Sequence, residues 1–414
     1  AIRKMRSAAE QATVLLSVRE GSSLKAALPG VLGGLADPRD RALCESLCFH
    51  SLRHWRRYDD LLCALLDKPL PPAMREVYFS RARVVPVIAP RHAGLANAIL
   101  RRFLRERESL AARYSAAPAL RYSHPDWLYQ RLAQDWPEDV LSILSNNITE
   151  APVWVRVNQS RVEDTEKLRT AWRAQGVESE ANPEQARALK LIDSGQPILL
   201  AGWAQGHFAV QDISVQNAVR ALDIQPGHRV LDACAAPGGK TVQMHDLCPQ
   251  ADILALDVDA RRVRRMEDAF RRQGVKADLR AVDAAQVSQW WDGQRFERIL
   301  IDAPCSGTGV IRRQPDILLH RRESDLPALL QRQRALLEAL WPLLQEGGRL
   351  VYATCSVLKD ENAHLVDAFL AAHPDAQSIA LDASFGRPSG AGWQRLPGEA
   401  EGDGFFVAAL GKKG

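Results

Sequence analysis

The stretch HRVLDACAAPGGKT, residues 228–241, sets the fold of the second half of this 414-residue chain. It begins with an apolar run of strand length, turns at two successive glycines and leads into a helical stretch. Glycines at such a turn let the backbone approach a ligand closely, because they carry no side chain. A strand, a tight loop and a helix in this order predict the first unit of an open α/β sheet that binds a ligand at the loop.

The same alternation of strand and helix continues toward the end of the chain. Helical stretches separate four further apolar runs of strand length, which are ADILALDVD (251–259), ADLRAVDA (277–284), RILIDAPC (298–305) and GRLVYATC (348–355). This alternation predicts a mostly parallel sheet with helices on both faces. The last run, GDGFFVAALG (402–411), is expected to be a closing edge strand.

The rest of the chain divides into two further parts. Apolar residues three and four positions apart predict helices over 3–18, 38–66, 92–110 and 126–145. In the second of these, Cys44 and Cys48 share the apolar face and are expected to be core residues. Strand-like stretches at 151–158 and 206–212 flank a predicted helix over 164–176. We therefore predict a helical domain (1–145), a small α/β connecting domain (146–220) and a doubly wound α/β domain (221–414).

The composition bounds the function. Hydrophobic residues make up 46% of the chain and charged residues 25%, as in soluble globular proteins, and no apolar run is long enough to span a bilayer. We expect a cytoplasmic protein without a membrane partner. The seven cysteines are odd in number and include no CxxC pair, which argues against a disulfide framework and a structural zinc site, so no metal is expected.

The positive charge lies at the front of the chain. Residues 1–130 hold 21 Lys/Arg against 12 Asp/Glu, whereas residues 131–414 hold 33 against 38. A basic front end favours an anionic partner such as nucleic acid, with a solvated, arginine-rich helical surface as the alternative. We expect the arginine clusters at 53–57 and 101–107 to hold phosphates, so that binding weakens with salt.

The strand ends carry acids that suit an adenosine ligand. Ligands of such sheets bind beyond the carboxyl ends of the strands, where Asp257 and Asp283 lie. GGKT resembles the end of a phosphate-binding P-loop, but Cys234 stands where that pattern requires glycine, and the GxGxxG dinucleotide pattern is absent. S-adenosylmethionine fits these features, with Asp257 on its ribose and Asp283 near its adenine. Taken singly, each aspartate also suits a cap or turn.

Two thiols lie at the same sheet edge. Cys305 follows Pro304 in a Gly/Ser loop, and Cys355 follows the last predicted parallel strand. Carbon 5 of a pyrimidine is a poor nucleophile, and addition of a thiolate to carbon 6 activates it toward a sulfonium methyl group. Amino-group methyltransferases usually carry a pattern such as NPPY where this chain has Asp302-Ala-Pro-Cys305. Carbon-5 chemistry is therefore favoured, although these residues alone do not rank the two thiols.

Three motifs, DACAAPGGKT, DAPCSGTG with the following VIRRQPD, and LVYATCSVL, together resemble the Sun/Fmu family of RNA cytosine-5 methyltransferases. The resemblance covers nearly the whole chain. It implies a Rossmann-like S-adenosylmethionine-dependent catalytic domain behind a NusB-like helical RNA-binding domain and a small α/β linker domain. It also implies methylation of a cytosine in 16S ribosomal RNA by a protein that we expect to be a monomer.

The resemblance also assigns roles to the site residues. It implies that Cys355 is the nucleophile, that Cys305 assists product release, and that Asp302 lies between the methyl donor and the target base. The implied cofactor loop consists of Cys234, Ala235, Ala236, Pro237, Gly238, Gly239 and Lys240, with Asp257, Asp283 and Asp302 completing the site.

The chain departs from the family pattern at residues 75–91, REVYFSRARVVPVIAPR, where relatives carry a longer, leucine-rich helical stretch. Two other functions are compatible with the sequence. The catalytic motifs also suit a transfer-RNA cytosine-5 methyltransferase. The basic helical domain also suits an RNA-binding assembly factor with a vestigial methyl site.

Overall fold

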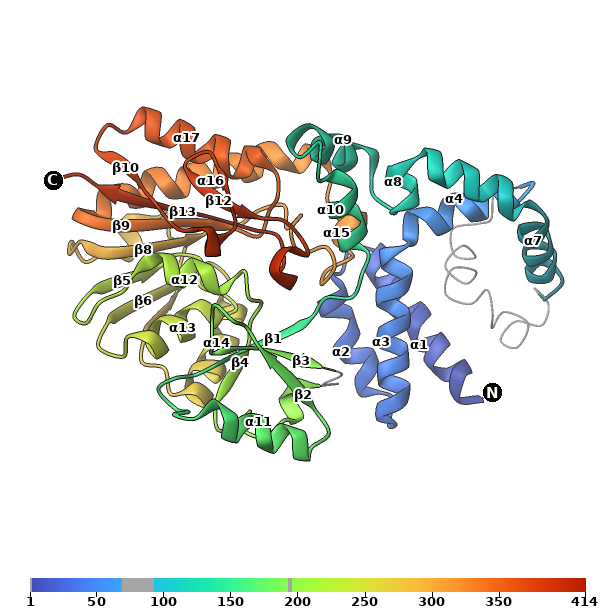
Figure 1. The fold of residues 1–414 in the computed structure, drawn as a ribbon, viewed down its shortest axis with the longest axis horizontal. Helices are drawn as coiled ribbons and strands as arrows, with labels where there is room; N and C mark the ends of the chain where they lie inside the picture. Colours follow the sequence, from blue (N-terminus) through green and yellow to red (C-terminus); the bar gives the residue numbers. More distant parts are fainter. Residues whose placement is uncertain (1, 69–92, 193–195) are drawn as a thin grey trace. The chain divides into compact units, whose positions relative to one another are not determined.

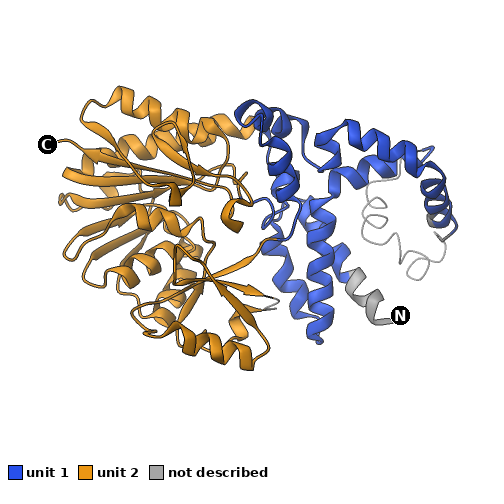
Figure 2. Cartoon of the chain, in the orientation of Figure 1, with its two compact units in different colours: residues 1–150, 310–323 blue, residues 151–309, 324–414 orange. Residues whose placement is uncertain are grey.

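A computed structural model describes residues 2–68, 93–192 and 196–414 of the chain. The divergent stretch 75–91 lies outside these residues. By internal contacts the chain forms two compact units, one of residues 1–150 and 310–323 and one of residues 151–309 and 324–414 (Figure 2). The predicted three-domain division stays a prediction. Among the helices of the described ranges, none combines the length and the apolar character needed to cross a membrane.

The first unit is helical, as predicted. Its helices are α1 (Ile2–Arg19), α2 (Leu24–Gly33), α3 (Pro38–Arg53), α4 (Trp55–Leu65), α7 (Ala93–Ala116), α8 (Pro118–Arg121), α9 (Asp126–Asp135), α10 (Val140–Asn147) and α15 (Ile317–His320) (Figure 1). Cys44 and Cys48 are fully buried among leucines and valines of α1, α2 and α3, which confirms that they are core residues. The later segment 310–323 joins this unit, since Leu319 packs against the same cluster.

The start of the second unit is a small antiparallel sheet with one helix. The strands β1 (Val153–Val157), β2 (Glu178–Ala181), β3 (Ala188–Ile192) and β4 (Phe208–Val210) pair in the order β2-β3-β1-β4. Asp164 caps the start of helix α11 (Thr165–Ala174), since its carboxylate accepts a hydrogen bond from the amide of Glu166. Its Trp172 is fully buried beside Phe208.

A nine-stranded sheet dominates the second unit. Its strand order is β11-β12-β13-β9-β8-β5-β6-β7, with β10 paired to β13. The bounds are β5 (Arg229–Asp232), β6 (Asp252–Asp257), β7 (Asp278–Ala281), β8 (Phe296–Asp302), β9 (Leu344–Thr354), β10 (Ala376–Ile379), β11 (Arg387–Ser389), β12 (Gly392–Arg395) and β13 (Phe405–Lys412). The five predicted parallel strands are confirmed, and the chain order reverses between β5 and β8. Such a switch point is where open α/β sheets bind ligands.

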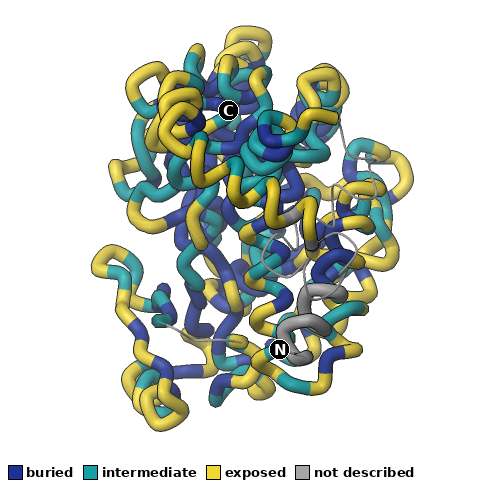
Figure 3. The backbone as a smooth tube through the Cα atoms, turned by 90° about the vertical axis from the view of Figure 1, so that its right-hand side faces the viewer, coloured by how far each residue is buried: buried dark blue, intermediate teal, exposed yellow. Residues whose placement is uncertain are grey.

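Helices cover both faces of this sheet, as predicted. Alternate residues of the strands point to opposite faces, so Leu231 and Tyr352 pack against α16 (Leu326–Leu340) and α17 (Ala363–Ala372). Val230 and Val351 point the other way, toward α12 (Gln216–Leu222) and α13 (Gly239–Leu247). Helix α14 (Ala260–Gln273) packs through Met266 and Phe270. Buried residues are dark blue in Figure 3.

Three predictions about elements were wrong. The final strand β13 is not an edge strand, because it pairs antiparallel with β9 on one side and with β12 and β10 on the other. The helix predicted over 38–66 breaks at His54 into α3 and α4. The helix predicted over 126–145 likewise divides into α9 and α10 around Pro137, whose ring cannot continue a helix.

Candidate active site

The two predicted thiols lie together. Cys355 directly follows β9, and Cys305 lies in the loop that follows β8, the neighbouring parallel strand. Their Sγ atoms are 3.4 Å apart and both residues are half-buried. The amide of Gly309 donates to the carbonyl of Cys355 at 2.8 Å, which fastens one thiol loop to the other. A side chain at Gly309 would collide with this carbonyl and with Gly404, so only glycine permits the approach.

An ion pair lies at the switch point. The Lys240 Nζ atom, from the first turn of α13, is 2.6 Å from Asp302 Oδ2 at the end of β8. Burial opposes the charge of Lys240, but Asp302 outweighs it, and the pKa of Lys240 is raised. The negative charge of Cys355 contributes to this rise. A cation is therefore held close to Cys355 at neutral pH.

The glycine loop forms a cradle ahead of α13. Gly238 has a φ of 101°, in the left-handed region, and a side chain there would press on Phe270 and Met266. Gly239 faces open space, since a Cβ atom there would meet no atom within 4 Å. The loop therefore combines a position that requires glycine with a position where a ligand can approach the backbone.

Asp257 closes the cradle from the next strand. Its carboxylate is buried and accepts hydrogen bonds from the amides of Ala236 and Asp259, both at 3.1 Å. Val258, the next residue, is 66% exposed, although valine is usually buried. An acid beside an open apolar side chain suits a ligand that joins a ribose to a flat, apolar ring.

Asp283 has a partner that the sequence did not indicate. Arg332 of α16 donates to both carboxylate oxygens, with N–O distances of 3.0 and 2.5 Å. This bidentate contact is the main reason that the pKa of Asp283 is lowered, so the carboxylate stays charged. Because helix α16 reads as an ordinary amphipathic helix, only the tertiary fold reveals this contact.

Burial raises the pKa of two further residues of the first motif. Burial raises the pKa of Cys234, which therefore stays a thiol. Burial also raises the pKa of Asp232 to about 7, although Thr241 donates a hydrogen bond to Asp232 Oδ2 at 2.7 Å. Asp232 Oδ1 is buried without a partner in the described part of the chain. Both Asp302 and Asp232 help to raise the pKa of Lys240, and the contribution of Asp302 is the larger.

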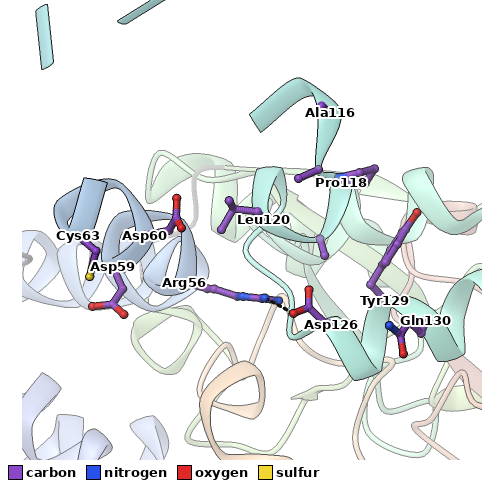
Figure 4. Close-up of a pocket in the computed structure, with 12 residues that line it drawn as sticks. Arg56, Asp59, Asp60, Cys63, Ala116, Pro118, Leu120, Asp126, Tyr129 and Gln130 are labelled. Atoms are coloured by element: carbon purple, nitrogen blue, oxygen red, sulfur yellow. Dashed lines mark hydrogen bonds and ion pairs between the residues drawn. The ribbon is translucent and has the colours of Figure 1, made fainter. Parts of the chain in front are cut away.

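Several arginines of the predicted phosphate clusters have internal partners. Arg56 lines a pocket of the helical unit together with Asp59, Asp60 and Asp126, and it binds Asp126 at 2.6 Å (Figure 4). Arg102 likewise binds Asp67 and Glu106, each at 2.9 Å. The phosphate role of both clusters stays a prediction.

The fold is similar to two solved structures. One, titled "Crystal Structure of PH0851", has a TM-score of 0.82 at 22% identity and covers 99% of both chains. The other, a "Methyltransferase Homolog Protein" from Pyrococcus horikoshii, has a TM-score of 0.61 at 27% identity and covers 72% of this chain and 97% of its own. The predicted fold class is thereby confirmed, while the NusB-like character of the helical part stays a prediction.

The sheet order and the site at its switch point define a Rossmann-like methyltransferase. Residues 219–411 match the family described as "16S rRNA methyltransferase RsmB/F", and residues 124–197 match its ferredoxin-like domain. The chain is also 43% identical to "Ribosomal RNA small subunit methyltransferase B" of Xanthomonas campestris pv. campestris over 416 residues, covering 94% of this chain and 93% of that relative. The chain therefore belongs to the RsmB/F family of rRNA methyltransferases, and the predicted family is confirmed.

Proposed function

We propose that this chain transfers a methyl group from S-adenosylmethionine to carbon 5 of a cytosine in 16S ribosomal RNA. The observation that carries the proposal is the pair of sulfur atoms 3.4 Å apart at the carboxyl ends of β8 and β9. Methylation of an amino nitrogen or a ribose hydroxyl requires no thiol, whereas carbon 5 requires covalent activation of the ring. Two adjacent thiols supply one group for the addition and one for the release.

The residues of the cradle fit the cofactor. The loop of residues 234–240 would surround its methionine part, Asp257 would accept hydrogen bonds from its ribose, and Asp283 would lie near its adenine. The open apolar side chain of Val258 supports this arrangement, because an adenine ring packs well on such a surface. When bound, the cofactor supplies an electrophilic sulfonium methyl group.

The chain's own groups would then act in sequence on the base. The Cys355 thiolate adds to carbon 6, and the S–C bond makes carbon 5 nucleophilic. Asp302, held by Lys240, orients the ring by accepting a hydrogen bond from its amino group. After carbon 5 has gained the methyl group, Cys305 removes the proton from carbon 5. The electrons of that C–H bond restore the ring double bond, and the bond between carbon 6 and Cys355 breaks.

An arginine-rich helix supports binding of the RNA backbone beside this site. Helix α14 carries six arginines and two acids in 14 residues, and it begins three residues after Asp257. Arg264 and Arg265 are exposed and have no ion-pair partner among the described residues. We therefore add this helix to the clusters at 53–57 and 101–107 as a surface for phosphates.

The test uses 16S ribosomal RNA that carries tritium on carbon 5 of its cytosines. Methylation at carbon 5 releases one tritium per methyl group transferred, whereas methylation at nitrogen or ribose releases none. We expect stoichiometric release with 16S RNA and none with transfer RNA. Methyl transfer without tritium release would contradict the proposed chemistry, and activity on transfer RNA alone would contradict the proposed substrate.

A further inference from the structure

Glu361 is a buried carboxylate that lies between the two thiol loops. It ends a short 3-10 turn, Lys359–Glu361, six residues after Cys355, and its relative exposure is 0%. In the described part of the chain no lysine, arginine or histidine forms an ion pair with it. Since a buried charge without a counter-ion is costly, hydrogen bonds alone must stabilise this carboxylate.

Four hydrogen bonds meet on this carboxylate, and three of them come from the residues that follow the two thiols. The amide of Ser306 and the Gln333 side chain donate to Oε1, at 2.8 and 3.0 Å. The Ser306 hydroxyl donates to Oε2 at 2.6 Å, and the Ser356 hydroxyl donates to the same oxygen. One carboxylate therefore holds both thiol loops in place.

The same network reaches the backbone just before the first thiol. The Gln333 side chain, which donates to Glu361, also donates to the carbonyl of Pro304 at 2.9 Å. The Tyr352 hydroxyl donates to the backbone carbonyl of Glu361 at 2.7 Å, which fixes the turn on β9. Glu361 is thus anchored independently of the two serines.

The charges around the two sulfur atoms differ in sign. The pKa of the Cys305 thiol is raised by its hydrogen bond with Cys355, by burial, and by the negative charges of Cys355 and Glu361. The cation of the site, Lys240, instead interacts with Cys355. The negative charge of Glu361 therefore disfavours the thiolate at Cys305.

We propose that Glu361 is the positioning residue that assigns the two thiols their roles, holding Cys305 protonated beside Cys355 so that Cys355 is the thiolate that attacks the base. This inference rests on the proposed function, since it explains how two adjacent thiols are told apart. On this proposal Cys305 is the donor in the contact between the two sulfur atoms, which are 3.4 Å apart.

The arrangement also orders the later step. When Cys355 bonds to carbon 6 it becomes a neutral thioether, so the hydrogen bond that raises the pKa of Cys305 most is lost, together with the charge of Cys355. Cys305 can then release its proton to water and act as the base that removes the carbon-5 proton. The Glu361 charge, which remains, keeps Cys305 a strong enough base for that transfer.

The test measures the reactivity of Cys305 alone. In full-length protein carrying Cys355→Ser, the pH dependence of Cys305 alkylation by iodoacetamide is followed by mass spectrometry of its peptide, with and without Glu361→Gln. We expect Glu361→Gln to lower the midpoint pH by about one unit, because an isosteric amide removes one nearby negative charge. Ser306→Ala removes hydrogen bonds but keeps the charge, so its midpoint should stay within experimental error of the parent.

An unchanged midpoint in Glu361→Gln, or an equal shift in Ser306→Ala, would overturn the proposal. Should Glu361→Gln fail to fold, as judged by circular dichroism, Glu361→Asp replaces it. A smaller downward shift is then expected, because the carboxylate withdraws by one methylene group, and the absence of a shift would again overturn the proposal. The readout needs neither RNA nor turnover, so it is separate from the proposed function, which fails if methyl transfer proceeds without tritium release.

Discussion

At the residue scale, we expect replacements of the two thiols to have different effects. Replacing Cys355 with Ala should lower turnover by roughly 10³-fold or more, because Cys355 is the proposed nucleophile that forms the bond to carbon 6. Replacing Cys305 with Ala should trap the adduct, seen as a slowly migrating protein–RNA band on a denaturing gel. The double variant is the control and should give no band. Normal turnover in Cys355→Ala, or no band with Cys305→Ala, would contradict the assigned roles.

Asp232 should make stability depend on pH. Its pKa is about 7 in the folded chain and 3.8 in its ordinary environment, so folding takes up a proton between these values. The contribution of Asp232 to the free energy of unfolding is therefore complete below about pH 4. It is lost as pH rises through 7, by up to about 4 kcal/mol. The free energy of unfolding, measured with urea, should fall less between pH 5 and 8 for Asp232→Asn than for the parent. Parallel curves for the two proteins would count against the shifted carboxyl.

The residues that sequence could find are those placed by the strands themselves. Cys355 and Asp302 lie where a strand ends, so periodicity locates them at the sheet edge. Arg332 is 49 residues from Asp283, and no local pattern relates the two. Glu361 lies three residues after the third motif, and its role depends on Ser306, 55 residues away. Pattern therefore predicts which groups reach the site and not which groups hold them there.

At the element scale, we expect the two glycines at the start of α13 to have different roles, one in stability and one in cofactor binding. Gly238→Ala should destabilise the protein by about 1–2 kcal/mol, because its left-handed backbone is strained for any other residue. Gly239→Ala meets open space and should leave the melting temperature nearly unchanged. We expect Gly239→Ala nevertheless to weaken S-adenosylmethionine binding in calorimetry, since its methyl group enters the cradle. Normal cofactor affinity in Gly239→Ala would place the cofactor elsewhere.

Helix α14 offers a test of the RNA surface. Replacing Arg264 and Arg265 together with Glu should raise KM for RNA roughly tenfold and reduce its salt dependence, because two phosphate contacts are lost. The double Lys variant keeps the charge and should behave nearly as the parent does. Cofactor affinity should be the same in all three proteins. An unchanged KM in the Glu variant would remove this helix from the RNA surface.

The element boundaries show which features of the fold the sequence pattern could not predict. The parallel strands were predictable, because buried strands give continuous apolar runs between turns. The break at His54 was not, since no glycine or proline stands near it. The interior position of β13 was not predicted, because an apolar run does not indicate which strands pair with it. Only the pairing with β9, β10 and β12 makes it an interior strand.

At the scale of the whole molecule, contacts with the rest of the helical unit hold segment 310–323 in place. The Arg53 side chain donates to the carbonyl of Arg312 at 2.9 Å, and the His320 ring contacts the carbonyl of Val18 at 2.6 Å. A chain that starts at residue 151 loses both partners. Trypsin should then cut after Arg321 at least about ten times faster than in the full chain, because local opening controls cleavage. Arg261, exposed on α14, is the control site and should be cut equally in both.

That segment also constrains how such a protein can evolve or be recombined. The backbone passes between the two compact units at 150/151, again at 309/310 and back at 323/324. A single genetic crossover near residue 150 would therefore combine residues 1–150 of one ancestor with the segment 310–323 of another. A working chimera must exchange two separate stretches at once, so the helical and catalytic parts are expected to share one line of descent.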